Sequence, residues 1–285
     1  MTYDWDTDTL FVVGDGGTAI VQVSKTGQLI NTMTLAQGSS PLGTAFYDIE
    51  GLTYIGGGKF VMTEERDRQL VQFTYAAGTT LTRADTQTVK LGTTIGNIGF
   101  EGASWDPQTQ GFIVTKEMTP ESIFQTMVDF ANGTASNGSP TATGSTDLFN
   151  PALLGLSDIA DVYALSNLTA LSGLPQYGSM LVLSQEDGRI VNVDRLGNIS
   201  SALTIVSNPG NPLSIAGQQH EGMTMGADGT LYITSENGGG DFDHPQLWVY
   251  KASTVPNQAP TALALTGKTT SIAENTSTTT RIKVA

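Results

Sequence analysis

The sequence predicts an all-β fold: a five-bladed β-propeller of four-stranded antiparallel blades around a central channel. Three observations support this prediction. Short β-branched and aromatic segments alternate with Gly- and Asp-rich turns, helix signals are nearly absent, and an acid-glycine phrase returns at intervals of roughly 50 to 60 residues. Together with the opening segment, the copies of that phrase give five units, each long enough for four strands and their loops.

The opening segment shows the strand and turn pattern expected of one blade. Strands are predicted at 10–13, 19–23 and 28–35, and the first of them ends at the turn sequence Gly14–Gly17. Asp228-Gly229 marks a similar hairpin late in the chain. Gly and Asp supply the positive φ that tight hairpins require, so consecutive strands should pair antiparallel.

Each copy of the repeated phrase carries two carboxylate positions about fifteen residues apart, separated by an apolar stretch. The clear copies are Glu50-Gly51 with Glu64-Glu65, Glu101-Gly102 with Glu117, and Glu221-Gly222 with Glu236. A degenerate fourth copy has Ala160 at the glutamate position, flanked by Asp158 and Asp161, and continues to Glu186.

The first carboxylate of each copy should project into the central channel, because the innermost strand of each blade lines it. We therefore predict a metal site formed by Glu50, Glu101 and Glu221, with Asp158 or Asp161 from the fourth blade. Converging carboxylates raise one another's pKa unless a cation offsets their repulsion. Ca²⁺ suits such a ring because it accepts six to eight oxygens in flexible geometry, whereas Mg²⁺ requires a tighter octahedron. The alternative is that these side chains cap backbone amides or line a wet channel without metal.

The second set of carboxylates is expected near a mouth of the channel. It comprises Glu64, Glu65, Glu117, Glu186 and Glu236. Lys116, Arg66 and Arg68 lie among them in the sequence, so one interpretation is a group of salt bridges. The other is that Glu65 or Glu117 acts as a general acid or base across a cleft.

Composition narrows the range of partners. The chain of 285 residues has 27 acidic and 13 basic residues, a formal charge of −14, which argues against nucleic acid and permits divalent cations. Cysteine is absent, which excludes a disulfide framework, a thiolate zinc site and a cysteine nucleophile. No apolar run is long enough for a membrane helix, and the polar start shows no signal peptide. We expect an excised piece of a longer protein that acts outside the cell or on its surface.

The composition changes near residue 252. We predict a propeller over 1–252, and over 253–285 a linker followed by the truncated start of a cadherin-like or immunoglobulin-like repeat. Pro256–Thr261 has the character of a linker, and a strand should resume around Leu263. About thirty residues cannot close such a sandwich, which takes about a hundred.

The repeated phrases resemble the SdiA-regulated, YjiK-like family of bacterial proteins over roughly residues 3–252. The matching segments are 48–55 with 64–67, 99–102 with 116–117, 181–184 with Glu186, and 221–222 with 235–236. The resemblance implies a five-bladed propeller and little about activity. By looser analogy, calcium-activated nucleotidases also place glutamates and serines from five blades around an axial calcium.

This chain departs from the pattern in two places. Ala160 replaces a glutamate in the fourth copy. In the first copy Asp15 corresponds to Glu64, and the matching inner residue would fall just before Met1, so one ring position is missing. The tail strand around Leu263 is a candidate for closing the last blade.

Three functions fit these observations. The first is an extracellular calcium-binding propeller that serves as a recognition or scaffold module of a larger bacterial surface protein, with a small-molecule or protein ligand. The second is a calcium-dependent hydrolase of phosphate or ester bonds. The third, a peptide- or sugar-binding propeller without metal, needs exposed aromatic residues, for which the sequence offers Tyr54, Tyr177 and Phe242, whereas Trp5, Trp105 and Trp248 are expected in the cores of the blades.

Overall fold

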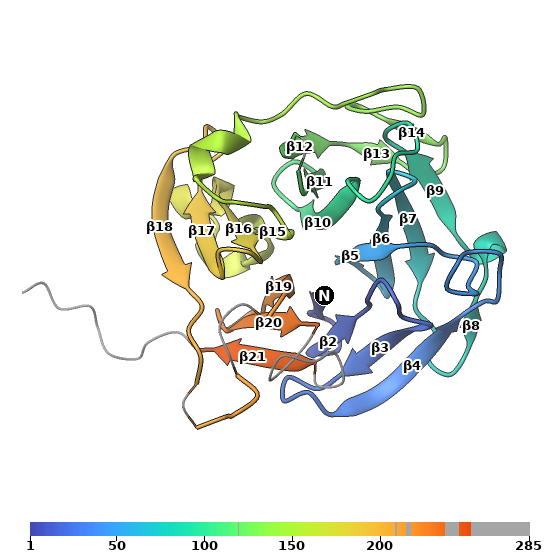
Figure 1. Cartoon of the computed structure of the whole chain (residues 1–285), viewed down its shortest axis with the longest axis horizontal. Helices are drawn as coiled ribbons and strands as arrows, with labels where there is room; N and C mark the ends of the chain where they lie inside the picture. Colours follow the sequence, from blue (N-terminus) through green and yellow to red (C-terminus); the bar gives the residue numbers. More distant parts are fainter. Residues whose placement is uncertain (119, 209, 215–217, 237–244, 252–285) are drawn as a thin grey trace, which may run out of the picture. The chain divides into compact units, whose positions relative to one another are not determined.

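Five small, mostly antiparallel sheets surround a central axis in the computed structural model of the chain (Figure 1). The structure describes residues 1–118, 120–208, 210–214, 218–236 and 245–251. Met1–Lys251 form one compact unit. The predicted repeat at 253–285, its strand around Leu263 and the aromatic residue Phe242 lie outside the described residues.

The blades follow one another in chain order. The first consists of β1 (Thr2–Asp4), β2 (Thr9–Val12), β3 (Ala19–Val23), β4 (Leu29–Leu35) and β8 (Thr80–Leu81), and the second of β5 (Ile49–Gly56), β6 (Lys59–Glu64), β7 (Gln69–Thr74) and β9 (Gln87–Lys90). The third consists of β10 (Phe100–Asp106), β11 (Gly111–Lys116) and β12 (Ser122–Thr126), followed by the separate hairpin of β13 (Val128–Asp129) and β14 (Thr134–Ala135). The fourth consists of β15 (Asp161–Ala164), β16 (Met180–Ser184), β17 (Arg189–Val193) and β18 (Ile199–Thr204), and the fifth of β19 (His220–Met225), β20 (Leu231–Ser235) and β21 (Gln246–Tyr250).

The five-bladed, all-β prediction is confirmed, but the blades are not uniformly four-stranded. Within the described residues the first blade has five strands, because β8 from the second blade's long loop adds parallel to β4, and the third and fifth blades have three each. Helical structure is limited to single turns of 3₁₀ helix in this part of the chain. These are η1 (Arg83–Asp85), η2 (Pro151–Leu154), η3 (Leu165–Asn167), η4 (Thr169–Leu171) and η5 (Pro175–Gly178).

The innermost strands β1, β5, β10, β15 and β19 lie next to one another around the axis (Figure 1). Because each belongs to a different sheet, its N–H groups facing the next blade have no strand partner, and buried N–H groups need one. Side-chain oxygens take that role at every blade boundary. Tyr54 N donates to Thr2 Oγ1 (3.0 Å), Trp105 N to Thr53 Oγ1 (2.8 Å), Ala164 N to Ser104 Oγ (2.9 Å), Met223 N to Asp161 Oδ2 (2.7 Å) and Tyr3 N to Thr224 Oγ1 (3.0 Å).

The glycine of the repeated phrase allows these strands to approach one another. A Cβ at Gly51 would lie 2.9 Å from the carbonyl oxygen of Glu101, and one at Gly102 would lie 2.8 Å from Cα of Asp161. Both distances are shorter than real Cβ contacts, and backbone atoms there cannot move aside. The acid-glycine pair therefore combines a channel-facing acid with the close packing of two blades.

Replacing Thr53 by Val should lower the free energy of unfolding by about 1 kcal/mol, because the partly buried backbone N–H of Trp105 loses its acceptor while the volume of the buried Thr53 side chain hardly changes. Urea unfolding would measure the loss. Thr53→Ser is the matched control, since it retains the hydroxyl. Equal stability of the Val and Ser variants would contradict a role for this bond.

Candidate functional site

An acidic cavity of about 160 Å³ lies at one end of the channel, and we call it the acidic basin. It is lined by Asp15, Glu50, Glu65, Asn97, Glu101, Glu117, Asp158, Ala160, Gln185, Glu221 and Glu236. The lining contains eight carboxylate side chains and no basic one. Most of these residues occupy equivalent positions in the five blades, so two rings of side chains can be defined by strand register.

The inner ring lies three residues before the side chain that bridges each blade to the next. Counting back from Thr53, Ser104 and Thr224 gives Glu50, Glu101 and Glu221. In the fourth blade the bridging side chain is Asp161, but the strand position equivalent to Thr53 and Ser104 is Tyr163, because Ala164 N donates to the preceding blade as Tyr54 N and Trp105 N do. Three residues before Tyr163 is Ala160, and three before Thr2 would fall before Met1. The structure thus brings Glu50, Glu101 and Glu221 together in one cavity, with a methyl group at the fourth position.

The outer ring comes from the loop or turn that follows the second strand of each blade. The residues that pair with Thr2, Thr53, Ser104, Tyr163 and Thr224 are Phe11, Val61, Ile113, Leu181 and Tyr232. Four positions further along the chain stand Asp15, Glu65, Glu117, Gln185 and Glu236, and all five line the basin. Asp15 is therefore the counterpart of Glu65 and not, as the sequence indicated, of Glu64.

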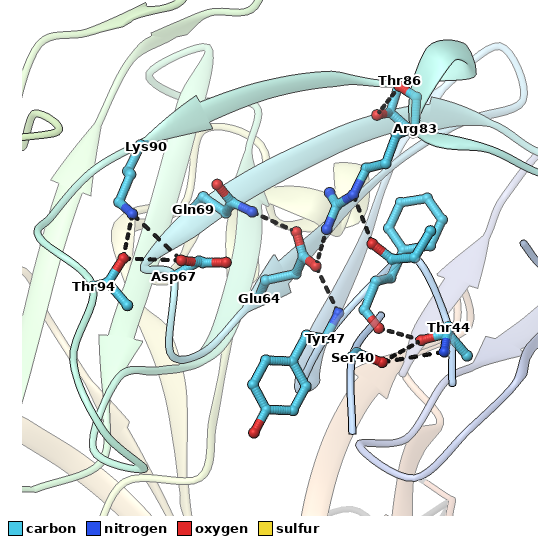
Figure 2. Close-up of polar contacts among 12 residues, drawn as sticks. Ser40, Thr44, Tyr47, Glu64, Asp67, Gln69, Arg83, Thr86, Lys90 and Thr94 are labelled. Carbon is cyan, nitrogen blue, oxygen red and sulfur yellow. Dashed lines mark hydrogen bonds and ion pairs between the residues drawn. The ribbon is translucent and has the colours of Figure 1, made fainter. Parts of the chain in front are cut away.

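The prediction that Glu64 lies at the channel mouth is wrong. Glu64 is the last residue of β6 and Glu65 the first of the turn that follows, and only Glu65 lines the basin. Glu64 is fully buried on the other side, where it forms an ion pair with Arg83 and accepts hydrogen bonds from Tyr47 N (2.8 Å) and Gln69 Nε2 (2.6 Å) (Figure 2). Its role is to hold the second blade together.

Glu186 and Asp161 also differ from their predicted places. Glu186 is exposed in the turn after β16, and Gln185 occupies the position in the lining. Asp161 follows the ring position by one residue, so its side chain is buried at the blade boundary, where it accepts from Met223 N and from Val162 N (2.8 Å). Burial raises the pKa of Asp161 to about 6.

Asp158 lies in the basin, but its oxygens are already used. It accepts hydrogen bonds from Ser184 Oγ and from the backbone N–H groups of Gln185 and Glu186, both at 3.1 Å. Asp48 is its counterpart in the second blade, two residues before Glu50, and it is paired with Arg66. Asp48 and Asn97 were not predicted as site residues from the sequence, although Asp48 lies two residues before Glu50 just as Asp158 lies two residues before Ala160, and this matching offset indicates it.

Burial and mutual repulsion act together on the inner ring. Burial first, and then neighbouring carboxylates, raise the pKa of Glu50 to about 9, of Glu101 to about 11 and of Glu221 to about 8. In the outer ring, burial raises the pKa of Glu65 to about 7, and the pKa values of Glu117 and Glu236 are raised as well. The basin therefore favours the binding of protons or of a cation.

The nearby basic side chains do not supply this positive charge. Arg66 is bound to Asp48 and Asn97 and, among the described contacts, reaches the basin carboxylates only through a longer ion pair with Glu65 (4.0 Å), and Lys116 Nζ donates to the carbonyl oxygens of Met118 and Pro120. Gln185 partly offsets the repulsion among the carboxylates. In the side-chain amide orientation that satisfies its hydrogen bonds, its nitrogen donates to the carboxylate of Glu221. The remaining repulsion is what a bound cation would offset.

The arrangement fits calcium. One oxygen from each of Asp48, Glu50 and Glu65 can be chosen so that all three lie within 4.8 Å of one another. Ca²⁺–oxygen distances of about 2.3–2.6 Å allow ligands of one ion to be up to about 5 Å apart. Glu101 and Glu221 would add carboxylate oxygens from the inner ring.

The described fold and site define a class: a five-bladed β-propeller with an acidic basin at one end of its axis. The chain matches the model of the SdiA-regulated family over residues 1–238 and belongs to that family. None of the described helices has the length and apolar character needed to span a membrane.

Three solved structures share low sequence identity with the chain. A protein of unknown function from Bacteroides caccae is 14% identical, with a TM-score of 0.47, covering 85% of this chain and 89% of its own. A luciferin-regenerating enzyme is 11% identical, with a TM-score of 0.44 and 82% coverage of each chain. A chain of a nidogen/laminin complex is 13% identical, with a TM-score of 0.47, covering 82% of this chain and 70% of its own.

Proposed function

We propose that this propeller binds calcium in the acidic basin and acts outside the cell as a recognition or scaffold module of a larger surface protein. The observation that supports the ion is the inner ring: Glu50, Glu101 and Glu221 are largely buried together, and the pKa of each is raised to about 8 or above. A protein gains little from burying such groups unless a cation binds them. Calcium is chosen because the basin offers many oxygen ligands and because the distances between these oxygens suit an ion of its size.

The extracellular role is supported by composition. The chain is acidic and free of cysteine, and the sequence after residue 252 resembles the start of an adhesin-type repeat. Calcium sites of extracellular modules bind with dissociation constants of about 10⁻⁴–10⁻³ M, matched to the calcium available there. Protease treatment of intact cells tests the location, since a surface module is degraded without lysis.

Isothermal titration calorimetry tests the metal site directly. We expect saturable calcium binding with a Kd between about 10⁻⁶ and 10⁻³ M and weaker binding of magnesium. Glu221→Gln should weaken calcium binding at least about tenfold, because it removes one charged ligand of the inner ring. Glu186→Gln is the matched control: it makes the same chemical change at an exposed position outside the lining.

Two results would overturn the calcium proposal. One is the absence of binding heat up to millimolar calcium, combined with an unchanged melting temperature. The other is equal loss of affinity in the Glu221→Gln and Glu186→Gln variants, which would show that net charge alone governs binding.

A second candidate function is a calcium-dependent hydrolase of phosphate or ester bonds. One observation favours it: a cavity of about 400 Å³ between the first and fifth blades shares Asp15, Glu50, Glu221 and Glu236 with the basin and continues over apolar residues such as Val12 and Leu247. A substrate held there would reach an axial ion. Glu65, with its pKa raised to about 7, is suited to accept a proton at neutral pH.

Screening phosphate esters, nucleotides and carboxylic esters with calcium present tests this candidate. Turnover that chelator removes and that Glu101→Gln abolishes would support it. If calcium binds but none of these substrates is hydrolysed, the binding module is the correct description.

A further inference from the structure

The opposite end of the channel holds a second cavity, of about 430 Å³, whose lining is uncharged and rich in aromatic residues, unlike that of the basin. Glu50 and Tyr54 mark the two ends on β5: the first lines the basin and the second lines this cavity. Four residues of strand separate them by about 13 Å. The aromatic side chains in its lining are Tyr3, Trp5, Tyr54, Trp105, Tyr163 and Tyr177, and we call it the aromatic cavity.

Trp5 and Trp105 were both expected in the cores of the blades; this prediction is wrong for Trp5, whereas Trp105 packs against a hydrophobic core and on Phe112 and also lines the cavity. Trp5 is 41% exposed and packs edge-to-face on Tyr54, with ring centroids 4.5 Å apart. Trp105 is half-buried and lines the same cavity. Tyr3, Tyr54 and Trp105 each follow a residue that bridges two blades, so the repeat itself places an aromatic ring at the cavity in three successive blades.

The cavity carries no charge. None of its described lining residues is acidic or basic, in a chain with a formal charge of −14. Its polar groups are hydroxyls, amides and indole N–H groups. Among the described contacts, the indoles of Trp5 and Trp105 and the hydroxyls of Tyr177 and Thr169 make no hydrogen bond within the protein, so they are available to a ligand.

The backbone around the cavity, by contrast, is already used. The amides of Tyr3, Tyr54, Trp105 and Ala164 donate to the hydroxyls that join the blades. A peptide could not extend a sheet there, because β-strand addition requires free backbone groups. Recognition must come from aromatic faces and neutral side-chain donors.

Tyr54, expected to be exposed, is buried, and Tyr3 and Tyr163 are nearly so, which leaves Trp5, Trp105 and Tyr177 as the accessible rings. We propose that the aromatic cavity binds a neutral carbohydrate, a short oligosaccharide whose apolar ring faces pack on these three rings. Aromatic side chains with one apolar body and one polar tip suit a ligand with the same mixed character. The volume lies within the range of about 300–1,000 Å³ found for small-molecule sites, and it exceeds what a lone methylammonium group fills. This site is independent of the calcium proposal, since none of its lining residues contributes to the basin.

Tryptophan fluorescence provides the test, because Trp5 and Trp105 line the cavity while Trp248 packs on His220 in the fifth blade. The probes are maltotriose, cellotriose, mannotriose and triacetylchitotriose, with choline and a neutral tetrapeptide as competing ligand classes. Chemical-shift changes in a ¹⁵N-labelled sample are recorded in parallel. We expect at least one trisaccharide to give a saturable response, with chelator and with calcium alike.

Variants locate the response. Trp5→Ala should weaken sugar binding at least about tenfold, which corresponds to about 1.4 kcal/mol. Tyr177→Ala, at a separate part of the lining, should weaken it as well and serves if the first variant does not fold. Trp248→Phe is the matched control and should bind as the parent does.

Three outcomes would overturn the proposal. The first is no saturable change with any trisaccharide at about 10 mM by either method. The second is a response to choline or to the peptide in place of the sugars. The third is full sugar affinity in both the Trp5→Ala and Tyr177→Ala variants, which would place the sugar elsewhere.

Discussion

Calcium is expected to raise the melting temperature of this protein by about 5–10 °C over its value in chelator. Saturation at about one hundred times the Kd stabilises the native state by about 2.7 kcal/mol. For a domain of about 250 residues each kcal/mol corresponds to about 2–4 °C. Differential scanning fluorimetry with calcium and with EDTA measures the shift.

Glu101→Gln should act with opposite signs in the two conditions. In chelator it should raise the melting temperature, because the folded state no longer has to hold a proton on a buried carboxyl whose pKa is about 11. With calcium the variant should have a lower melting temperature than the parent, because a ligand of the ion has been removed and calcium stabilises the fold less. The crossing of the two effects distinguishes a metal site from a surface that merely carries excess charge.

Glu186→Gln again provides the comparison, since Glu186 is exposed and outside the lining. Its melting temperatures should differ from those of the parent much less than those of Glu101→Gln do, because among the described groups the charge of Glu186 acts on the basin only through Glu117. A Glu101→Gln variant that is less stable in chelator would contradict the account, because it would mean that the carboxylate itself stabilises the fold.

In chelator, the free energy of unfolding is expected to fall as pH rises from about 7 to 9. Glu50 and Glu221 have pKa values of about 9 and 8 in the folded state, raised from 4.5. A carboxyl whose folded pKa is raised contributes stability that is complete below the unfolded value and is lost as pH rises through the folded value. Each proton that the fold holds beyond the unfolded chain changes the free energy by about 1.4 kcal/mol per pH unit.

The window starts at pH 7 because His220 acts in the opposite direction below it. Burial lowers the pKa of His220 to about 4, so the unfolded chain binds a proton there as pH falls below about 6.5, which lowers the stability of the fold on that side. The Met1 amino group, whose pKa burial lowers from 8.0, also opposes the trend up to about pH 8, but the three inner-ring glutamates outweigh this one amine. Urea unfolding at each pH measures the slope. Glu50→Gln should reduce the slope, and calcium should flatten it because the ion replaces the held protons.

A direct readout accompanies the stability curve. Adding calcium to the unbuffered protein near pH 7.5 should release protons, which a pH electrode detects. Stability in chelator that rises between pH 7 and 9, together with no proton release, would contradict raised pKa values in the basin.

Much of the fold could be predicted from the repeated phrase alone. The glycine after each ring glutamate is required because a side chain at Gly51 or Gly102 would collide with the backbone of the next blade. The repeated glycine therefore indicates where two blades pack closely, and the glutamate before it indicates which residues face the channel. The same repeat gave the positions of Glu50, Glu101 and Glu221, which the structure gathers in one cavity.

The outer ring was harder to predict, because a shift of one residue along the chain turns the side chain to the opposite side. Glu64 and Glu65 are adjacent, and only the strand register decides which of them enters the basin and which pairs with Arg83 (Figure 2). The same one-residue ambiguity led to Glu186 in place of Gln185. A glutamate is easier to notice than a glutamine, but period-two alternation and not residue type decides the face.

The aromatic cavity had a signal that was present but not used. Tyr3, Tyr54 and Trp105 are spaced at 51 residues, the same interval as the first two ring glutamates. Aromatic residues in strands are usually core residues, so the spacing suggested packing. Only the assembled propeller shows that these positions line a cavity at one end of the channel.

The sequence by itself determined the five-bladed architecture and the inner carboxylates, because a repeat places equivalent residues at equivalent points around an axis. The tertiary structure decided which neighbours face the channel, that Asp161 is buried between blades, and that Asp15 and Gln185 complete the outer ring. The physical reason is that side-chain direction depends on pairing between strands, and pairing is a property of two segments together, which no single segment of sequence contains.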